Sequence, residues 1–189
     1  MKDQITGRLR DLAAMATLAA ERLGDDAETA ARMMRDAMRD GGTLFFCGNG
    51  GSAADAQHLA TEYVVRYMKN RRALPAIALT TDTSLITATG NDFGFDEIFS
   101  RQVEALVTAR DVLVIHSTSG SSPNVLKAAE AARRKGARVI AFSSRDGGAL
   151  RALADHSVIV PTDRTDRAQE IHLCIEHAIC EVIEGELGA

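Results

Sequence analysis

The sequence predicts an α/β fold in which helices cover both faces of a parallel β-sheet. Five short apolar runs of strand length alternate along the chain with longer stretches of helical periodicity. Neighbouring parallel strands need such long crossover connections, whereas antiparallel strands need only a tight turn. The first apolar run also ends in a glycine-rich turn that leads directly into a helix, and many α/β proteins bind a ligand at such a turn.

The first forty residues are expected to form two helices that precede the sheet. Apolar residues from Ile5 to Leu18 recur at helical spacing, and the segment Gly24-Asp25-Asp26 interrupts the pattern. A second periodic run follows and ends at Gly41-Gly42, which is a typical helix stop.

The alternation then assigns each later element to a residue range. Strands are predicted at Thr43–Cys47, Ala76–Leu79, Val112–His116, Arg138–Phe142 and Ser157–Val160. Helices are predicted at Ser52–Tyr67, Asp82–Thr89, Glu97–Leu106, Ser122–Lys135, Gly148–Leu153 and Arg164–Leu187. Ligands of such folds bind at the carboxyl ends of the strands, so the loops after the strands are the places to search for function.

The composition is that of a globular protein and argues against nucleic acid as a partner. With 189 residues, the chain is most simply one domain. Aromatic residues make up only 4% and tryptophan is absent, so a stacking surface for single-stranded nucleic acid is not expected. The net charge of −4 also argues against a large basic face.

The cysteines and the amino-terminal segment predict a cytoplasmic protein. The three cysteines, Cys47, Cys174 and Cys180, show no C-x-x-C spacing and leave an odd count, which fits a reducing compartment. Charged residues recur throughout the first 26 positions, so we expect neither a secretion signal nor a membrane span.

The loop after the first predicted strand reads Cys47-Gly-Asn-Gly-Gly-Ser52. Its glycines allow the backbone to approach an anion closely, and Gly48, Gly50 and Ala53 satisfy the dinucleotide pattern G-x-G-x-x-G/A. The acidic residue of that pattern should follow about twenty positions later. Asp82 follows about thirty positions later instead, so a dinucleotide site is the weaker interpretation. A plain tight turn is a further alternative.

A second loop, which follows Val112–Ile115, concentrates hydroxyl groups. It reads His116-Ser-Thr-Ser-Gly-Ser-Ser-Pro123, with five hydroxyls in six residues before a predicted helix. Hydroxyls together with the free amides of a helix start suit a phosphate monoester. The alternative is a solvated turn without a ligand.

Two predicted helices carry polar side chains at helical spacing. His58 and Glu62 are spaced i, i+4, and Gln169 and His177 are spaced i, i+8 on the last helix. Together they could bind a divalent metal such as zinc, or they could serve as a general acid and base. Taken alone, each pair could equally be a surface contact. His172, beside this row, is expected to be solvated or to face another subunit.

The motifs that carry these residues resemble those of the sugar isomerase (SIS) domain family over nearly the whole chain. They are CGNGGSAADAQHLATE (47–62), GNDFGFDEIFSRQVEAL (90–106), STSGSSPNV (117–125) and DRAQEIHLCIEH (166–177). The resemblance implies a single SIS domain over residues 1–189, a three-layer α/β/α sandwich with a five-stranded parallel sheet. Extra N-terminal helices over residues 1–41 would pack on the core and take part in oligomerisation. It further implies a homotetramer with active sites between subunits.

The resemblance also implies roles for individual residues. Glu62 and His177 would be the catalytic acid–base pair, and one zinc ion per subunit would be bound by His58, Glu62, Gln169 and His177. The substrate would be bound by Asn49, Gly50, Gly51, Ser52, Arg66, Asp92, Ser117, Thr118, Ser119, Ser122, Asp166 and Gln169, with the phosphate in the loop from Ser117 to Ser122.

The activity implied is aldose–ketose isomerisation of a sugar phosphate. The substrate would be D-sedoheptulose 7-phosphate and the product D-glycero-D-manno-heptose 7-phosphate, formed in the first step of nucleotide-activated heptose synthesis. A non-catalytic family member that binds a replication initiator is the alternative. The chain keeps His177 and the STSG segment, which favours the enzyme.

Overall fold

A computed structural model of the chain describes residues 1–188 and contains one sheet of five parallel strands. The strand order is β2-β1-β3-β4-β5. The strands are β1 (Leu44–Gly48), β2 (Ala76–Ala78), β3 (Val112–His116), β4 (Arg138–Ser144) and β5 (His156–Val160). The predicted fold class is therefore confirmed, and each strand lies within two residues of its predicted range.

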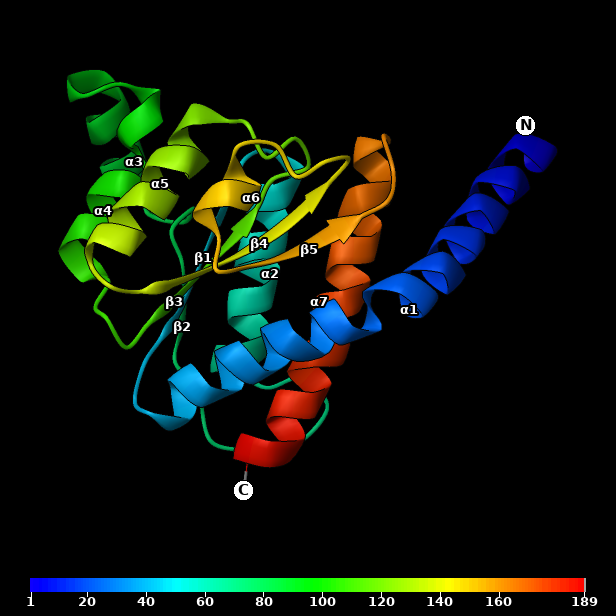
Figure 1. Cartoon of the computed structure of the whole chain (residues 1–189), viewed down its shortest axis with the longest axis horizontal. Helices are drawn as coiled ribbons and strands as arrows, with labels where there is room; N and C mark the ends of the chain where they lie inside the picture. Colours follow the sequence, from blue (N-terminus) through cyan, green and yellow to red (C-terminus); the bar gives the residue numbers. More distant parts are fainter. Residues whose placement is uncertain (189) are drawn as a thin grey trace.

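Helices connect the strands and form two layers around the sheet (Figure 1). They are α1 (Lys2–Arg39), α2 (Gly51–Val64), α3 (Thr83–Asp92), α4 (Ser100–Leu106), α5 (Pro123–Arg134), α6 (Leu150–Leu153) and α7 (Thr165–Leu187), with a short 3₁₀ turn at Phe95–Glu97. Within residues 1–188, no helix combines the length and the apolar composition that crossing a bilayer requires.

Each face of the sheet buries its own hydrophobic cluster, because successive strand residues point to opposite faces. Leu44 and Phe46 of β1 pack in one cluster with residues of α1, α2 and α7. Phe45 and Cys47 of the same strand pack in the other cluster with residues of α4, α5 and α6. Helices α2 and α7 are thus neighbours on one face, and they carry the predicted histidines and Glu62.

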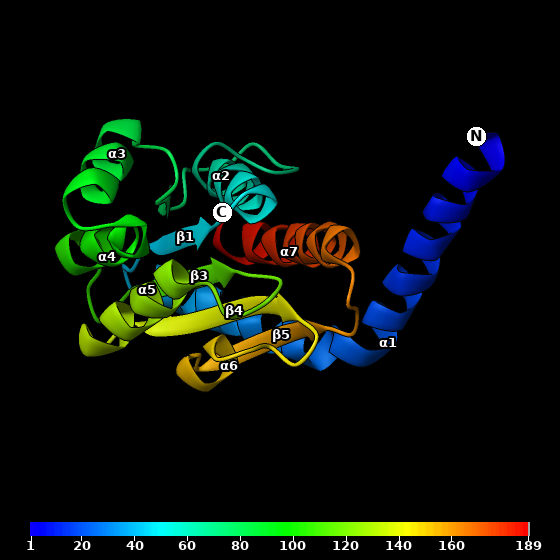
Figure 2. The ribbon, with the colours of Figure 1, turned by 90° about the horizontal axis from the view of Figure 1, so that it is seen from above.

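The prediction of two amino-terminal helices is wrong, because residues 2–39 form one continuous helix. Gly24 lies inside it, at a cost of about 1 kcal/mol relative to alanine. Burial of Leu23 and Ala30 on either side offsets that cost. The helix changes direction near its middle (Figures 1 and 2), where the His156 ring bonds the carbonyl of Asp26 at 2.8 Å.

The strand order places a topological switch point between β1 and β3. The connection from β1 leads to β2 on one side, whereas the connection from β3 leads to β4 on the other side. Ligands of such sheets bind where the two connections diverge, at the carboxyl ends of β1 and β3. Gly48 pairs with His116 at the carboxyl ends of β1 and β3. The glycine turn and the hydroxyl-rich loop therefore begin side by side.

Candidate functional site

A polar cavity of about 310 Å³ lies at this switch point. It brings together nine of the residues that the sequence predicts for substrate binding, together with His116 and Thr165. The nine are Asn49, Gly50, Gly51, Ser52, Ser117, Thr118, Ser119, Ser122 and Gln169. Two loops and the start of α7, far apart in the sequence, therefore share one cavity.

The glycine turn shapes one wall of the cavity. A side chain at Gly48 would lie 2.8 Å from the carbonyl oxygen of His116, so only glycine lets β1 approach the loop after β3 so closely. A side chain at Gly51 would lie 2.6 Å from the side-chain amide of Gln169, so the absence of a side chain here allows α7 to pack closely against the start of α2. The Asn49 amide exchanges hydrogen bonds of 2.8 Å with Asn124, which joins the turn to α5.

The hydroxyl-rich loop forms the opposite wall and ends at the amino terminus of α5. Gly120 has a φ of 60° and its Cα approaches the backbone of Gly147, so the loop folds through a conformation that favours glycine. Ser122 is the N-cap residue of α5, yet its side chain makes no capping bond. Pro123 has no N–H group and the N–H of Val125 bonds the carbonyl of Ser122, so the Ser122 hydroxyl and the backbone N–H of Asn124 are the donors that this helix start offers to an anion in the cavity.

Three predicted substrate-binding residues lie elsewhere in the described chain. Arg66 donates to the carbonyl of Tyr67, and Asp92 accepts a bond of 2.7 Å from Asn91. Asp166 pairs with Arg164, and this pairing lowers the pKa of Asp166 to about 2. None of the three lines the cavity of its own chain.

A second polar site lies further along the same two helices. The Nε2 atoms of His58 and His177 are 2.8 Å apart, and Nε2 of His58 is 3.5 Å from Oε1 of Glu62. Ligand atoms of all three residues lie within 4.8 Å of one another, and no other His, Cys, Asp or Glu trio in residues 1–188 does so. The ring of Tyr67 stacks on His177, with centroids 5.3 Å apart. Burial, together with nearby His58, lowers the pKa of His177.

The donor set of this cluster fits a zinc ion. Two imidazole nitrogens and one carboxylate are the ligands that zinc takes at catalytic sites, where the fourth position stays open. Gln169, the fourth predicted ligand, lies against Gly51. It precedes His177 by eight residues, which is about 12 Å of helix.

Sequence reasoning missed a buried polar layer beneath the cavity. His116 and Glu176 are both fully buried and their side chains lie 2.6 Å apart. Burial raises the pKa of Glu176. The prediction that His172 is solvated or faces another subunit is wrong, because this side chain is also fully buried and its Nε2 bonds the carbonyl of Ser143 at 2.9 Å. Side-chain spacing on α7 places His172 and Glu176 four residues apart, but only the packed sheet shows that they face inwards.

Comparisons with known proteins agree with these features. The sequence profile of the SIS domain matches residues 9–144. The chain is 51% identical to a phosphoheptose isomerase from Geobacter sp. (strain M21) over 99% of its own length and 97% of the relative. The solved structure of a phosphoheptose isomerase from Neisseria gonorrhoeae superposes with a TM-score of 0.92 and is 43% identical, covering 97% of this chain and 98% of that one. A second, from Francisella tularensis, has a TM-score of 0.93 and 36% identity, with 97% of each chain covered.

The match extends beyond the shared fold, because relatives at this level of identity align over nearly the full length of both chains. The segments aligned include both loops of the cavity and the two helices that carry the His58–Glu62–His177 cluster. The chain belongs to the SIS domain family and, within it, to the phosphoheptose isomerases.

Proposed function

We propose that the protein is an aldose–ketose isomerase that converts D-sedoheptulose 7-phosphate to D-glycero-D-manno-heptose 7-phosphate. The observation that carries the proposal is the presence of two separate polar sites along α2 and α7, one at the starts of these helices and one further along them. The phosphate of the substrate and its reacting carbons, C1 and C2, lie at opposite ends of the molecule. A site for this sugar therefore needs an anion seat and, some distance away, a centre for proton transfer.

The two sites have the separation and the chemistry for this task. The cavity holds the hydroxyls of Ser117, Thr118 and Ser119 and the start of α5, which suit the phosphate. From Ser52 at the cavity to His58 and Glu62, α2 rises by about 9 to 15 Å. The helix thus spans from the phosphate end of a seven-carbon sugar towards its carbonyl end.

Isomerisation moves one proton from C1 to C2 and another from O1 to O2 through an enediol. Glu62 and His177 are the acid and base of this proposal, since both belong to the cluster and each is partly accessible. The lowered pKa of His177 keeps its ring neutral near pH 7, so the ring has a lone pair to accept a proton. Arg66, Asp92 and Asp166 would reach the substrate from the surface of a neighbouring subunit.

The cluster is also the proposed zinc site, with one ion per subunit. His58, Glu62 and His177 would bind the ion, and Gln169 would complete the set after leaving its position beside Gly51. When bound, zinc supplies Lewis-acid polarisation of the sugar oxygens. A lone pair that binds zinc cannot accept a proton at the same time. With an ion bound, Glu62 would have its second carboxylate oxygen for the proton, and His177 would accept a proton only when its ring does not bind the ion.

The test is to incubate the purified protein with D-sedoheptulose 7-phosphate, with and without added zinc, and to measure the aldoheptose formed. We expect turnover that a chelator removes and zinc restores. A ketopentose 5-phosphate should react far more slowly, because its phosphate and carbonyl ends are closer together. Absence of turnover under all conditions would contradict the proposal and favour the non-catalytic, partner-binding alternative. Full activity after chelation would show that zinc has no part in the proposed reaction.

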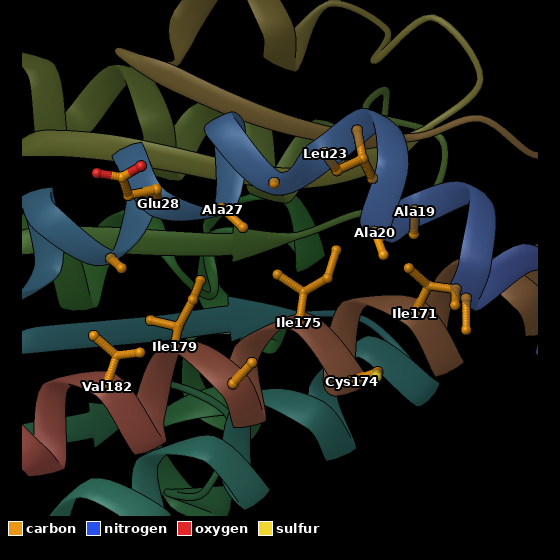
Figure 3. Close-up of a pocket in the computed structure, with 14 residues that line it drawn as sticks. Ala19, Ala20, Leu23, Ala27, Glu28, Ile171, Cys174, Ile175, Ile179 and Val182 are labelled. Atoms are coloured by element: carbon orange, nitrogen blue, oxygen red, sulfur yellow. The ribbon is translucent and has the colours of Figure 1, made fainter.

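We further propose that residues 1–189 form a single SIS domain that assembles as a homotetramer. An apolar groove of about 350 Å³ runs between α1 and α7 and is lined by residues such as Leu23, Ile175 and Val182 (Figure 3). The first half of α1 projects away from the sheet (Figure 2), with 59% of Ile5 and 64% of Leu9 exposed. Second copies would cover these apolar surfaces. Light scattering coupled to gel filtration should give four times the mass of 20.2 kDa, and a monomer would contradict the proposal.

Finally, we propose a cytoplasmic location and no nucleic-acid or membrane partner. All three cysteines are free thiols, and two of them, Cys47 and Cys180, are buried in the core. Free thiols fit a reducing compartment. Fractionation of cells that produce the protein would test the location.

A further inference from the structure

A buried ion pair connects the end of α2 with α7, close to the His58–Glu62–His177 cluster. Glu184 of α7 and Arg71, in the loop after α2, form an ion pair with Oε1 and Nε 3.0 Å apart. Each side chain is only 1% exposed. We refer to this pair as the clasp. A buried ion pair often costs as much in desolvation as it returns in attraction, so its presence calls for an explanation beyond stability.

The carboxylate of the clasp organises the loop after α2. Its two oxygens accept backbone N–H groups from Tyr67, Met68 and Lys69, at 2.9, 2.8 and 2.9 Å. Burial alone would raise the pKa of Glu184, but these three donors and Arg71 hold it below the usual value. The carboxylate is therefore charged near pH 7 and fixes three consecutive peptide groups. The ring of Tyr67, the first of them, stacks on His177.

The guanidinium of the clasp holds the carboxyl end of α2. Arg71 donates to the carbonyl of Glu62 at 2.7 Å and to that of Tyr63 at 2.8 Å. These carbonyls belong to the last turn of α2, where carbonyl groups have no hydrogen-bond partner within the helix. A positive charge at this end of the helix is also favourable for the helix dipole. One side chain thus bonds directly to the peptide group of Glu62.

We propose that Arg71 and Glu184 are positioning residues that set the distance between Glu62 and His177. The clasp attaches to Glu62 on α2, and on α7 it lies seven residues, or two turns, after His177. Through Tyr67 it also contacts the His177 ring. Both sides of the cluster are therefore held by one buried pair. This proposal rests on the proposed role of the cluster in metal binding and proton transfer.

Two conservative substitutions test the proposal in the full-length, zinc-loaded protein. Glu184→Gln keeps the size of the side chain but removes its charge, and Arg71→Lys keeps the charge but removes the fork that reaches two carbonyls. We expect kcat to fall by about tenfold or more, as for residues that orient metal ligands, with KM changed by less than about twofold. KM should be spared because the phosphate cavity lies at the other end of α2.

A second readout does not depend on isomerase activity. Titration of the metal-free protein with Co²⁺, followed by visible absorption, should show affinity reduced by about tenfold in both variants. Glu186→Gln is the matched control for Glu184, because Glu186 lies on the same helix and pairs with Arg35 at the surface. Arg72→Lys is the control for Arg71, and its side chain is exposed. Both controls should keep the parental kcat and Co²⁺ affinity.

The alternative is that the clasp only stabilises the fold. Variants with a lower melting temperature but parental kcat and Co²⁺ affinity would establish that alternative and overturn the proposal. If Glu184→Gln fails to fold, Glu184→Asp keeps the charge, shortens the side chain by one methylene and is measured in the same way. If the parent shows no isomerase activity, the proposed function fails, and the Co²⁺ titration still decides the role of the clasp.

Discussion

The cavity and the cluster are both polar and both include residues of α2 and α7, yet they are constructed differently. The cavity is made of backbone and short hydroxyl side chains, and its shape depends on close approaches at Gly48, Gly51 and Gly120. The cluster consists of three long side chains, and 44% of His58 and 20% of Glu62 remain exposed. The cavity should therefore be sensitive to changes of the backbone, whereas the cluster should be sensitive to changes of single functional groups.

The largest expected effect comes from removing a functional group of the cluster. Glu62→Gln and His177→Gln should each lower kcat by about 10² to 10⁴-fold, because a positioned acid or base contributes that much. Both side chains are partly accessible, so the melting temperature should stay within a few degrees of the parent. Steady-state kinetics and thermal unfolding measure the two quantities. Glu104→Gln, an exposed carboxylate that pairs with Arg134 on the opposite face, is the control and should be fully active.

Appreciable turnover by either variant would remove that residue from the acid–base pair. Unfolding of either would instead show that the cluster supports the fold, and the contrast between the two sites would then be wrong.

The next effect concerns the backbone of the cavity. In Gly120→Ala the added methyl would lie 1.9 Å from the carbonyl oxygen of Gly147, and the residue would keep a φ of 60°. The loop must shift, so we expect kcat/KM to fall by about a hundredfold, mostly through KM, and stability to fall by about 1 to 3 kcal/mol. Gly41→Ala separates the two causes, because Gly41 also has a positive φ of 82° but open space around it. Its cost should be about 1 to 2 kcal/mol of stability without any change in KM.

Parental KM in Gly120→Ala would show that the loop accommodates the methyl group and that its backbone does not define the anion seat.

Features that depend on local sequence could be predicted, whereas features that depend on contacts between distant parts of the chain could not. Alternating apolar runs identified all five strands, and the positions of Asn49 and Ser119 in loops after strands predicted that they lie at the same edge of the sheet. The place of Gln169 in the substrate site followed only from the family resemblance. Periodicity could not show that α1 passes through Gly24 without a break, because the compensating contacts are with distant parts of the chain. Helical spacing could also not show that His172 faces inwards, since burial depends on which side of α7 the sheet covers.

A smaller effect is expected from a single hydroxyl in the cavity. Ser119→Ala should raise KM by about fivefold to tenfold with kcat nearly unchanged, since one hydrogen bond to the phosphate is lost. Ser121→Ala is the control, because Ser121 is exposed and its hydroxyl bonds only the carbonyl of Ser119. Initial rates at a series of substrate concentrations decide the outcome. A fall in kcat with unchanged KM would place Ser119 at the reacting end of the sugar rather than at the phosphate.

The last prediction concerns the buried layer beneath the cavity, where the effect is on stability and its pH-dependent part develops on acidification. Burial lowers the pKa of His172 from 6.5 to about 3 in the folded protein. Below pH 6.5 the unfolded chain therefore takes up a proton that the folded chain does not, so stability falls as the pH drops towards 3. This one group contributes a slope of up to about 1.4 kcal/mol per pH unit. His172→Gln should be less stable than the parent at pH 7 but should lose less stability between pH 6 and pH 4. Thermal unfolding at equal protein concentration measures this difference, and parallel losses in the two proteins would show that His172 is already protonated in the fold.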